Sequence, residues 1–294
     1  MEVSTINTAL GQRAGVLRLV FGLLPPRDLK NVVLVCQLWR EVGEAPGLWA
    51  WVVIRVTRDN VSTMPERLDC RRMWAVRELR VEWGVEVSEE VLMAVARHQG
   101  LRVVELKQVN LSSVDPGLLA RVVGGLEEVV MCSRPDTRLT VQQWEAIFTA
   151  ISEGGCKLKR LVIYGNNLSR VDPGLLARAL TRVEEVVMYQ PRLTGPQQEA
   201  ILTAISSGDS RLKKLDIEHN KLSTVDPSLL ASAVNRLEKV KILGGQLTVE
   251  QVAAILTRSL LETSLRRLEM WQDWRDWQDQ DLVARARLAI GYIL

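Results

Sequence analysis

Two patterns of apolar residues alternate along most of the chain. Short runs with an apolar residue at every second position lead into longer runs with apolar residues every three or four positions. Leu161 and Ile163 belong to the first kind, because residues two apart share one face of a strand. Trp144, Ile147 and Ile151 belong to the second, because their spacing places them on one face of a helix. The pattern therefore predicts strand–helix units that follow one another without long linkers.

These units also repeat in sequence. Residues 111–131, 168–188 and 222–242 align closely, at offsets of 57 and then 54 residues. Each of these long periods holds two half-units, and the half-units are roughly 25 to 32 residues long, which is the range of stacked repeat proteins. A single strand–helix unit cannot bury its own apolar face, so the units are expected to stack. They open at Val76, Leu101, Leu126, Leu158, Val183, Leu212, Leu237 and Leu265.

Two kinds of helix start alternate along the repeats. The first is Asp-Pro, in which Asp accepts hydrogen bonds at the N-cap and Pro fits the first helical position. The second is a capping box, in which Thr and a Gln three residues later satisfy each other's backbone N–H groups. The Asp-Pro pairs begin at Asp115, Asp172 and Asp226, and the capping boxes are Thr140 with Gln143, Thr194 with Gln197 and Thr248 with Gln251.

The strand segments share a specific consensus. The clearest one, over residues 158–168, reads LKRLVIYGNNL, which is the pattern LxxLxLxxNxL. This pattern resembles the leucine-rich repeat, and the alternating helical half-units are most similar to its ribonuclease-inhibitor-like branch. The resemblance covers about residues 76–270. It implies an α/β solenoid of about eight units, with a parallel sheet on the concave side and helices outside. Val109, Pro191 and Gly245 replace Asn at the ninth position, so we expect looser turns in those units.

Residues 1–50 follow a different pattern. Val16, Leu17, Val20, Phe21 and Leu24 are spaced as one helical stripe, which Pro25-Pro26 ends. A second apolar helix follows, and Asp28 can cap it. Two helices of this size have too small a core to be stable alone, so they are expected to pack on the solenoid or on a partner. The second apolar face contains Leu29, Val32, Val33, Val35, Cys36 and Trp39.

This segment is similar to the F-box. A Leu-rich first helix is followed by D-L, by V-C-x-x-W and by L-W, as in that family. Its usual opening L-P-x-E is replaced here by Gln12–Gly15, which removes an apolar anchor. The matching residues are Leu17, Phe21, Leu24, Pro25, Asp28, Leu29, Val35, Cys36, Trp39, Leu48 and Trp49.

The F-box resemblance carries an expected function. Members with an F-box followed by leucine-rich repeats are substrate receptors of SCF-type ubiquitin ligases, which act in protein degradation. The F-box docks on the adaptor subunit, which joins it to a cullin, while the repeats hold the substrate. The resemblance implies that the adaptor-binding residues are Leu17, Phe21, Leu24, Pro25, Leu29, Val33, Val35, Cys36 and Trp39.

The positions between the buried strand residues define a candidate substrate surface. Side chains alternate along a strand, so these positions face the concavity. Two outward rows run across the units, apolar and aromatic in the middle and charged at the flanks, as expected of a protein-binding surface. The alternative, equally weighted, is that these positions are simply solvent-exposed. The candidate substrate-binding residues are Val130, Cys132, Arg134, Val162, Tyr164, Val187, Tyr189, Glu218, Leu243 and Trp271.

Composition and charge exclude several function classes. A net charge of +3 without a dense Lys/Arg run argues against a nucleic-acid partner. We also expect no membrane span and no signal peptide. The four Cys form no CxxC pair, which favours a reducing, intracellular location, in the cytoplasm, the nucleus or both. Cys36 is expected to be a buried packing thiol. The two histidines, His98 and His219, lie in different units, so neither a catalytic site nor a metal or cofactor is expected.

These observations divide the chain into three parts. Residues 1–50 form the F-box-like helical module, 51–270 the solenoid, and 271–294 a C-terminal cap that contains Trp271, Trp274 and Trp277. The expected function is a non-catalytic substrate receptor of a ubiquitin ligase, whose substrate protein is unknown. The alternative is a protein-binding scaffold or inhibitor-like binder, with a degenerate F-box and no ligase role.

Overall fold

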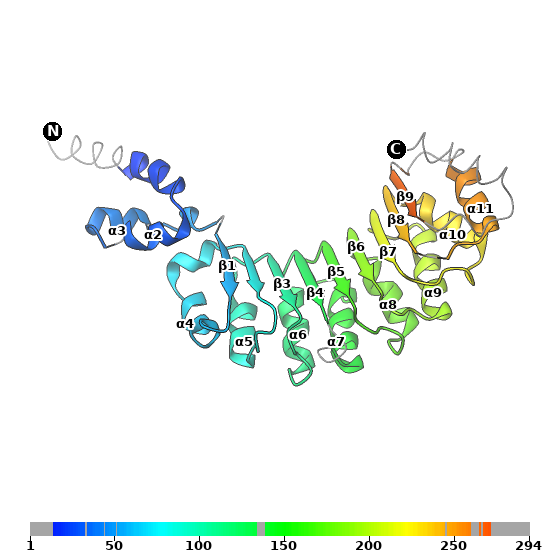
Figure 1. Cartoon of the computed structure of the whole chain (residues 1–294), viewed down its shortest axis with the longest axis horizontal. Helices are drawn as coiled ribbons and strands as arrows, with labels where there is room; N and C mark the ends of the chain where they lie inside the picture. Colours follow the sequence, from blue (N-terminus) through cyan, green and yellow to red (C-terminus); the bar gives the residue numbers. More distant parts are fainter. Residues whose placement is uncertain are drawn as a thin grey trace.

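The computed structural model describes residues 14–32, 34–43, 45–50, 52–133, 139–244, 246–259, 265 and 267–271. Within these residues the strands form one parallel sheet, in which each strand pairs with the next along the chain. Figure 1 shows the sheet on the inner side of a curved molecule and the helices on the outer side. The predicted α/β leucine-rich-repeat solenoid is therefore confirmed. The strands are β1 (Val53–Val56), β2 (Glu78–Val81), β3 (Val103–Lys107), β4 (Glu128–Cys132), β5 (Arg160–Tyr164), β6 (Glu185–Tyr189), β7 (Lys214–Glu218), β8 (Lys239–Leu243) and β9 (Arg267–Trp271).

The outer layer consists of one helix per unit over most of the solenoid. The exception is the connection from β1 to β2, where a short helix lies between two turns of 3-10 helix, η2 (Val61–Thr63) and η3 (Arg71–Ala75). The sequence pattern did not identify β1, because residues 53–56 precede the first recognisable repeat. The helices are α4 (Met64–Leu68), α5 (Glu89–Arg97), α6 (Pro116–Gly124), α7 (Val141–Ser152), α8 (Pro173–Leu180), α9 (Gly195–Ser206), α10 (Pro227–Asn235) and α11 (Val249–Ser259).

The N-terminal module is helical, as predicted. It contains a helix over residues 14–22, then α2 (Pro26–Val32) and α3 (Gln37–Gly43), and the 3-10 helix η1 (Pro46–Leu48) leads into β1. Buried residues of the module belong to the same hydrophobic cluster as those of the solenoid, from Phe21 and Leu29 through to Leu268. The module is thus packed on the open end of the solenoid, as its small core requires. The expected C-terminal cap over residues 272–294 lies outside the described residues.

Both kinds of helix start are confirmed. The N-cap side chain of Asp115 accepts from Leu118 N at 2.7 Å, and the equivalent caps of α8 and α10 do the same. In the capping box of α7, Gln143 Oε1 accepts from Thr140 N at 2.9 Å. The Nε2 atom of the same glutamine donates to Leu111 O at 2.6 Å and to Val114 O at 2.7 Å, in the preceding unit. Gln197 and Gln251 repeat these two bonds, so each capping glutamine also joins two units.

The turns after the strands share one backbone conformation. The first residue after a strand has φ between 51° and 66° in five units, at Gln108, Gly165, Gln190, His219 and Gly244. Two of these turns continue into Val109 and Pro191, and both of those side chains are buried where other units bury Asn. The Val109 turn keeps the shared conformation with an apolar side chain in the place of Asn, whereas the Pro191 turn contains a second left-handed residue, Arg192, with a φ of 54°. Gly245 lies outside the described residues.

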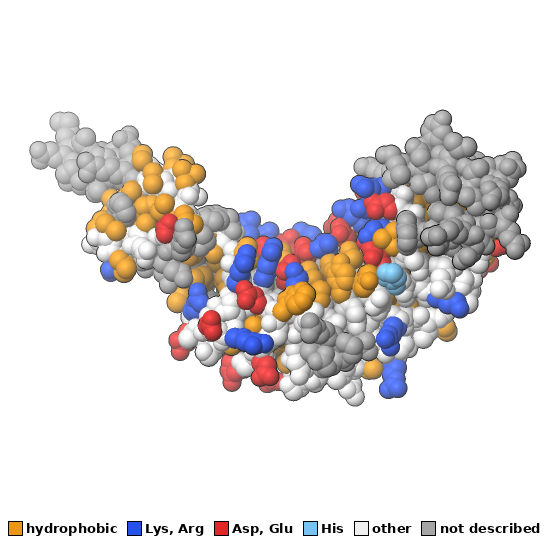
Figure 2. Space-filling view, viewed as in Figure 1, with side chains coloured by type: hydrophobic (Ala, Val, Ile, Leu, Met, Phe, Trp, Pro, Cys, Tyr) orange, Lys and Arg blue, Asp and Glu red, His pale blue; other side chains and the backbone are white. Residues whose placement is uncertain are grey.

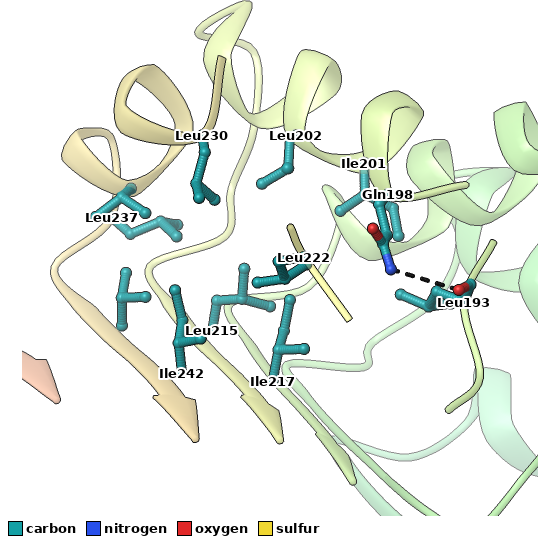
Figure 3. Close-up of a pocket in the computed structure, with 12 residues that line it drawn as sticks. Leu193, Gln198, Ile201, Leu202, Leu215, Ile217, Leu222, Leu230, Leu237 and Ile242 are labelled. Atoms are coloured by element: carbon teal, nitrogen blue, oxygen red, sulfur yellow. Dashed lines mark hydrogen bonds between the residues drawn. The ribbon is translucent and has the colours of Figure 1, made fainter. Parts of the chain in front are cut away.

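The layer between sheet and helices is closely packed. Figure 3 shows leucines and isoleucines of β7, β8, α9 and α10 pointing toward one another, with Gln198 Nε2 donating to Leu193 O at 3.4 Å. The cavity among them has a volume of about 10 Å³. This volume is at the lower limit for a single water molecule. The space therefore belongs to the core and offers no ligand site.

Candidate protein-binding surfaces

Several residues of the module that the F-box resemblance assigns to adaptor binding lie in its own core. Phe21 and Leu29 are 1% and 0% exposed, and Trp49 packs beside them at 1%. Leu17 and Leu24 are partly buried against the same cluster. Burial on this scale means that Phe21 and Leu29 shape the module from inside and do not touch a partner directly. Leu48 is buried as well.

The opposite side of the module is apolar and exposed. We call this the module face, and Figure 2 shows hydrophobic side chains gathered on the module at the left of the molecule. The first helix is apolar nearly all round, so it carries one stripe for the core and a second stripe on this face. The sequence interpretation merged the two stripes into one and left out Leu19 and Leu23 of this segment, as well as Leu34 after α2. The module face consists of Val16 (61% exposed), Leu19 (74%), Val20 (48%), Leu23 (87%), Leu34 (75%) and Val35 (60%).

Of the remaining predicted adaptor contacts, two are exposed and two lie outside the residues that the structure describes. Pro25 and Cys36 are exposed beside the module face. Cys36 was expected to be buried inside an apolar helix, and this is wrong because the thiol lies between α2 and α3, where the helix is interrupted. Val33 and the side chain of Trp39 lie outside the described residues.

The two predicted concave rows are aligned by the strand register. Val130 pairs with Val162, and Val162 with Val187, from β4 to β6. In the second row, Cys132 pairs with Tyr164, and this row continues through Tyr189, Glu218 and Leu243 to Trp271. The parallel register therefore brings together residues that are 25 to 32 positions apart in sequence. The side chain of Trp271 and the whole of Arg134 lie outside the described residues.

The middle of the concave face is a shallow apolar groove. Val130 and Val162 are 7% and 3% exposed, yet they are not part of the core cluster between sheet and helices. They form the floor of the groove, together with half-buried Val187. The sequence analysis predicted both valines as exposed substrate contacts. In the structure, neighbouring side chains of the curved sheet cover most of their surface. Figure 2 shows hydrophobic side chains in the hollow with charged groups to either side.

An aromatic row borders this floor at the carboxyl end of the strands. The rings of Tyr164 and Tyr189 lie 5.7 Å apart between centroids, and Tyr189 meets His219 edge-on at 5.0 Å. Tyr164 is 37% exposed. The sequence interpretation gave His219 no catalytic or metal-binding role and did not include it in the candidate surface. It missed this contact because the left-handed turn at His219 is what directs the imidazole toward the row.

Ion pairs border the other side of the floor. Arg160 lies between Glu128 and Glu185, and its Nε atom is 2.7 Å from Glu185 Oε1. Lys214 Nζ lies 3.3 Å from the other oxygen of Glu185. Burial would raise the pKa of Glu185, but the bonds and charges of Arg160 and Lys214 outweigh it and lower the pKa. These groups neutralise one another, so this border is polar without a large net charge.

Cys132 is the thiol nearest to the groove. It is half-buried, and burial raises its pKa more than the charge of Lys107 lowers it. A thiol nucleophile needs a lowered pKa. Cys132 is therefore suited to apolar contact and not to covalent chemistry. Within the described part of the chain, no group of three or more His, Cys, Asp or Glu side chains could hold a metal ion.

The charged flank of the groove includes two further residues of the predicted set. Glu218 is half-buried and paired with Lys241, and Leu243 is half-buried at the same end. Lys241 Nζ also lies 3.3 Å from Asp216 Oδ2.

Among the helices that the structure describes, none combines the length and the hydrophobicity of a membrane span.

Two family models match parts of this chain. The F-box-like family model matches residues 15–55, and the Leucine Rich Repeat model matches residues 211–233. A search of curated protein sequences gave no match. One similar solved structure is the leucine-rich repeat-containing protein LegL7 from Legionella pneumophila, at 11% identity and a TM-score of 0.46, over 84% of this chain and 94% of that one. The chain combines an F-box-like module with a leucine-rich-repeat solenoid.

Proposed function

We propose that this protein is the substrate receptor of an SCF-type ubiquitin ligase. The module face binds the adaptor subunit, and through it a cullin, while the concave groove of the solenoid binds the substrate protein. The observation that carries the proposal is the exposed apolar surface on the module that matches the F-box-like family. Contiguous exposed apolar side chains on a soluble domain are typical of a protein-binding site.

The physical contribution of such a receptor is proximity. A receptor that binds two proteins at once raises the local concentration of substrate lysines near the ubiquitin-loading enzyme. The two surfaces of this chain are joined by one continuous hydrophobic cluster, so the module and the solenoid can hold the two partners in a fixed relation. We assign no covalent step to the chain itself. The location that this role requires is inside the cell, in the cytoplasm, the nucleus or both.

The proposal is tested by measuring adaptor binding in variants that change exposed residues of the module face and leave the core intact. Leu23→Glu and Val35→Glu place a charge on side chains that are 87% and 60% exposed. Binding of the full chain to a recombinant SCF adaptor subunit should weaken at least roughly ten-fold, because a buried unpaired charge opposes association. Met93→Glu is the matched control, since Met93 is 39% exposed on α5, a helix of the solenoid.

The two outcomes separate receptor from scaffold. If wild type binds the adaptor and only the module-face variants lose it, the receptor role is supported. If wild type does not bind the adaptor at all, the chain is a protein-binding scaffold without a ligase role. Melting temperatures of all variants should match that of wild type, which shows that a loss of binding is not a loss of folding.

A further inference from the structure

The groove on the concave face has a shape that selects its occupant. We infer that it binds an amphipathic α-helix of the substrate protein, and that this helix carries a neutral hydrogen-bond donor at the Asp216 end of the groove. The groove is defined by its floor of Val130, Val162 and Val187 and its aromatic wall of Tyr164, Tyr189 and His219. Calling the partner the substrate rests on the proposed function, whereas its helical form rests on the groove alone.

The spacing of the aromatic wall fits a helix. Successive ring centroids lie 5.7 Å and 5.0 Å apart, from Tyr164 to Tyr189 and from Tyr189 to His219. An α-helix that crosses the strands repeats its surface about every 5.4 Å. An extended peptide repeats the same face only about every 6.6 Å, because its side chains alternate and it rises about 3.3 Å per residue. The helix therefore stays in register with the wall, and the extended chain does not.

The chemistry of the floor also favours a helix. The groove runs across the face of the sheet, where β4 to β8 already bond to each other on both sides. An extended peptide gains its affinity from backbone bonds at an open sheet edge, and this face offers none. A helix satisfies its own backbone groups and can lie on valine side chains without leaving N–H or C=O groups unpaired. The apolar side chains of Val162 and Val187 therefore suit the apolar stripe of a helix.

One end of the groove contains an acceptor without a donor. Asp216 lies in the same row as the three valines, one strand beyond Val187. Its Oδ1 atom is buried and receives no hydrogen bond from the described residues, while Oδ2 is 3.3 Å from Lys241 Nζ. Burial raises the pKa of Asp216 more than the charge of Lys241 lowers it. A buried acceptor of this kind destabilises the folded chain while it stays unpaired, so a ligand that donates to it gains affinity.

The cavity beside Asp216 narrows the choice of donor. It has a volume of about 120 Å³, and its lining includes Val187, Lys214, Lys239 and Lys241. Glu185 also lines the cavity, and each lysine is paired with a carboxylate: Lys214 with Glu185, Lys239 with Glu269, and Lys241 with Asp216 and Glu218. These pairs leave the lining with little net charge, so burying a charged tip of either sign there is costly and a neutral donor is favoured. A Ser, Thr, Asn or Gln side chain supplies such a donor. One strand spacing of about 4.8 Å corresponds to about three residues of helix, so the donor belongs three or four residues from the apolar residue over Val187.

A peptide selection tests this inference with the full chain. Peptides from a random 16-residue display library are selected for binding to wild type. Those that also bind the Tyr164→Ala/Tyr189→Ala double variant are then removed, so that only groove-dependent binders remain. We expect apolar residues at i, i+3 or i+4, and i+7, a Ser, Thr, Asn or Gln at one end, and a gain of helical circular dichroism on binding. Binding to the double variant should be at least ten-fold weaker, and Met93→Ala should bind like wild type.

The acceptor is tested separately. Asp216→Ala should remove the preference for the donor residue, while Asp209→Ala, an exposed loop position, should not. Retained peptides with apolar residues at every second position would overturn the inference, and so would a selection that retains no peptide. Adaptor binding is measured independently, so helical binders without adaptor binding would refute the ligase role and leave the groove assignment standing.

Discussion

The module and the solenoid use apolar residues in opposite ways. The solenoid turns nearly all of its Leu, Val and Ile side chains into one layer between sheet and helices, and unit joins unit through the buried glutamines. The module buries Phe21, Leu29 and Trp49 but keeps six apolar side chains on its surface. The difference is that the described units of the solenoid bury their apolar side chains against one another, whereas the described residues leave these six side chains of the module exposed.

The largest expected contrast is between a core residue and a module-face residue. Trp144 is 0% exposed and stacks on Phe148 at 5.3 Å, so Trp144→Ala should lower the free energy of unfolding by about 3–5 kcal/mol. Leu23→Ala should change it by less than about 0.5 kcal/mol, as for other surface positions. Urea unfolding measures both values. A large cost at Leu23 would show that the module face packs within the chain and is not free for a partner.

The second contrast lies within one helix of the solenoid. Gln143→Ala removes the capping bond to Thr140 and the two bonds to the preceding unit, and should cost about 2–4 kcal/mol. Its neighbour Gln142 is exposed, so Gln142→Ala is the matched control and should cost less than about 0.5 kcal/mol. Equal values for the two variants in urea unfolding would contradict the account of how the units are joined.

The smallest expected effect concerns His98, near the junction of module and solenoid. Its Nδ1 accepts from Gly100 N and Leu101 N, and its Nε2 lies 2.8 Å from Met73 O in η3. Burial lowers the pKa of His98, and this outweighs the carbonyl of Met73 and the charge of Asp69, which raise it. The unfolded chain therefore binds this proton more readily than the folded chain, so its contribution to stability is lost as pH falls below the ordinary histidine value.

Unfolding at pH 7.5 and at pH 5 measures the His98 contribution. The drop in unfolding free energy between the two values should be smaller in His98→Gln than in wild type. His219→Gln keeps the His98 contribution and serves as the control. A drop that is the same in His98→Gln and in wild type would show that His98 does not titrate in this range, or that the junction does not depend on its bonds.

Sequence reasoning recovered the features that recur with local spacing. The Asp caps and the capping boxes follow from residues three or four positions apart, and the strand register follows from the repeat of one strand consensus, so a single sequence reveals them. The cross-unit bonds of Gln143 were not foreseen, because their partners lie 29 and 32 residues away and are backbone atoms. Backbone partners have no signature in residue identity.

The errors in the predicted surfaces have a common physical origin. Leu19 and Leu23 were missed because a helix that is apolar all round has no unique buried stripe. The burial of Val130 and Val162 depends on side chains of neighbouring strands, and the position of His219 depends on a left-handed turn. Each of these properties is set by three-dimensional neighbours, so residue pattern alone left it undetermined.

Adaptor affinity in two variants tests the account most directly. The dissociation constant of the full chain for a recombinant SCF adaptor subunit is measured for wild type, for the module-face variant Leu23→Glu/Val35→Glu and for the groove variant Tyr164→Ala/Tyr189→Ala. We expect binding by wild type, an at least ten-fold loss of affinity in the module-face variant and no change in the groove variant. No binding by wild type, or an equal loss in both variants, would contradict it.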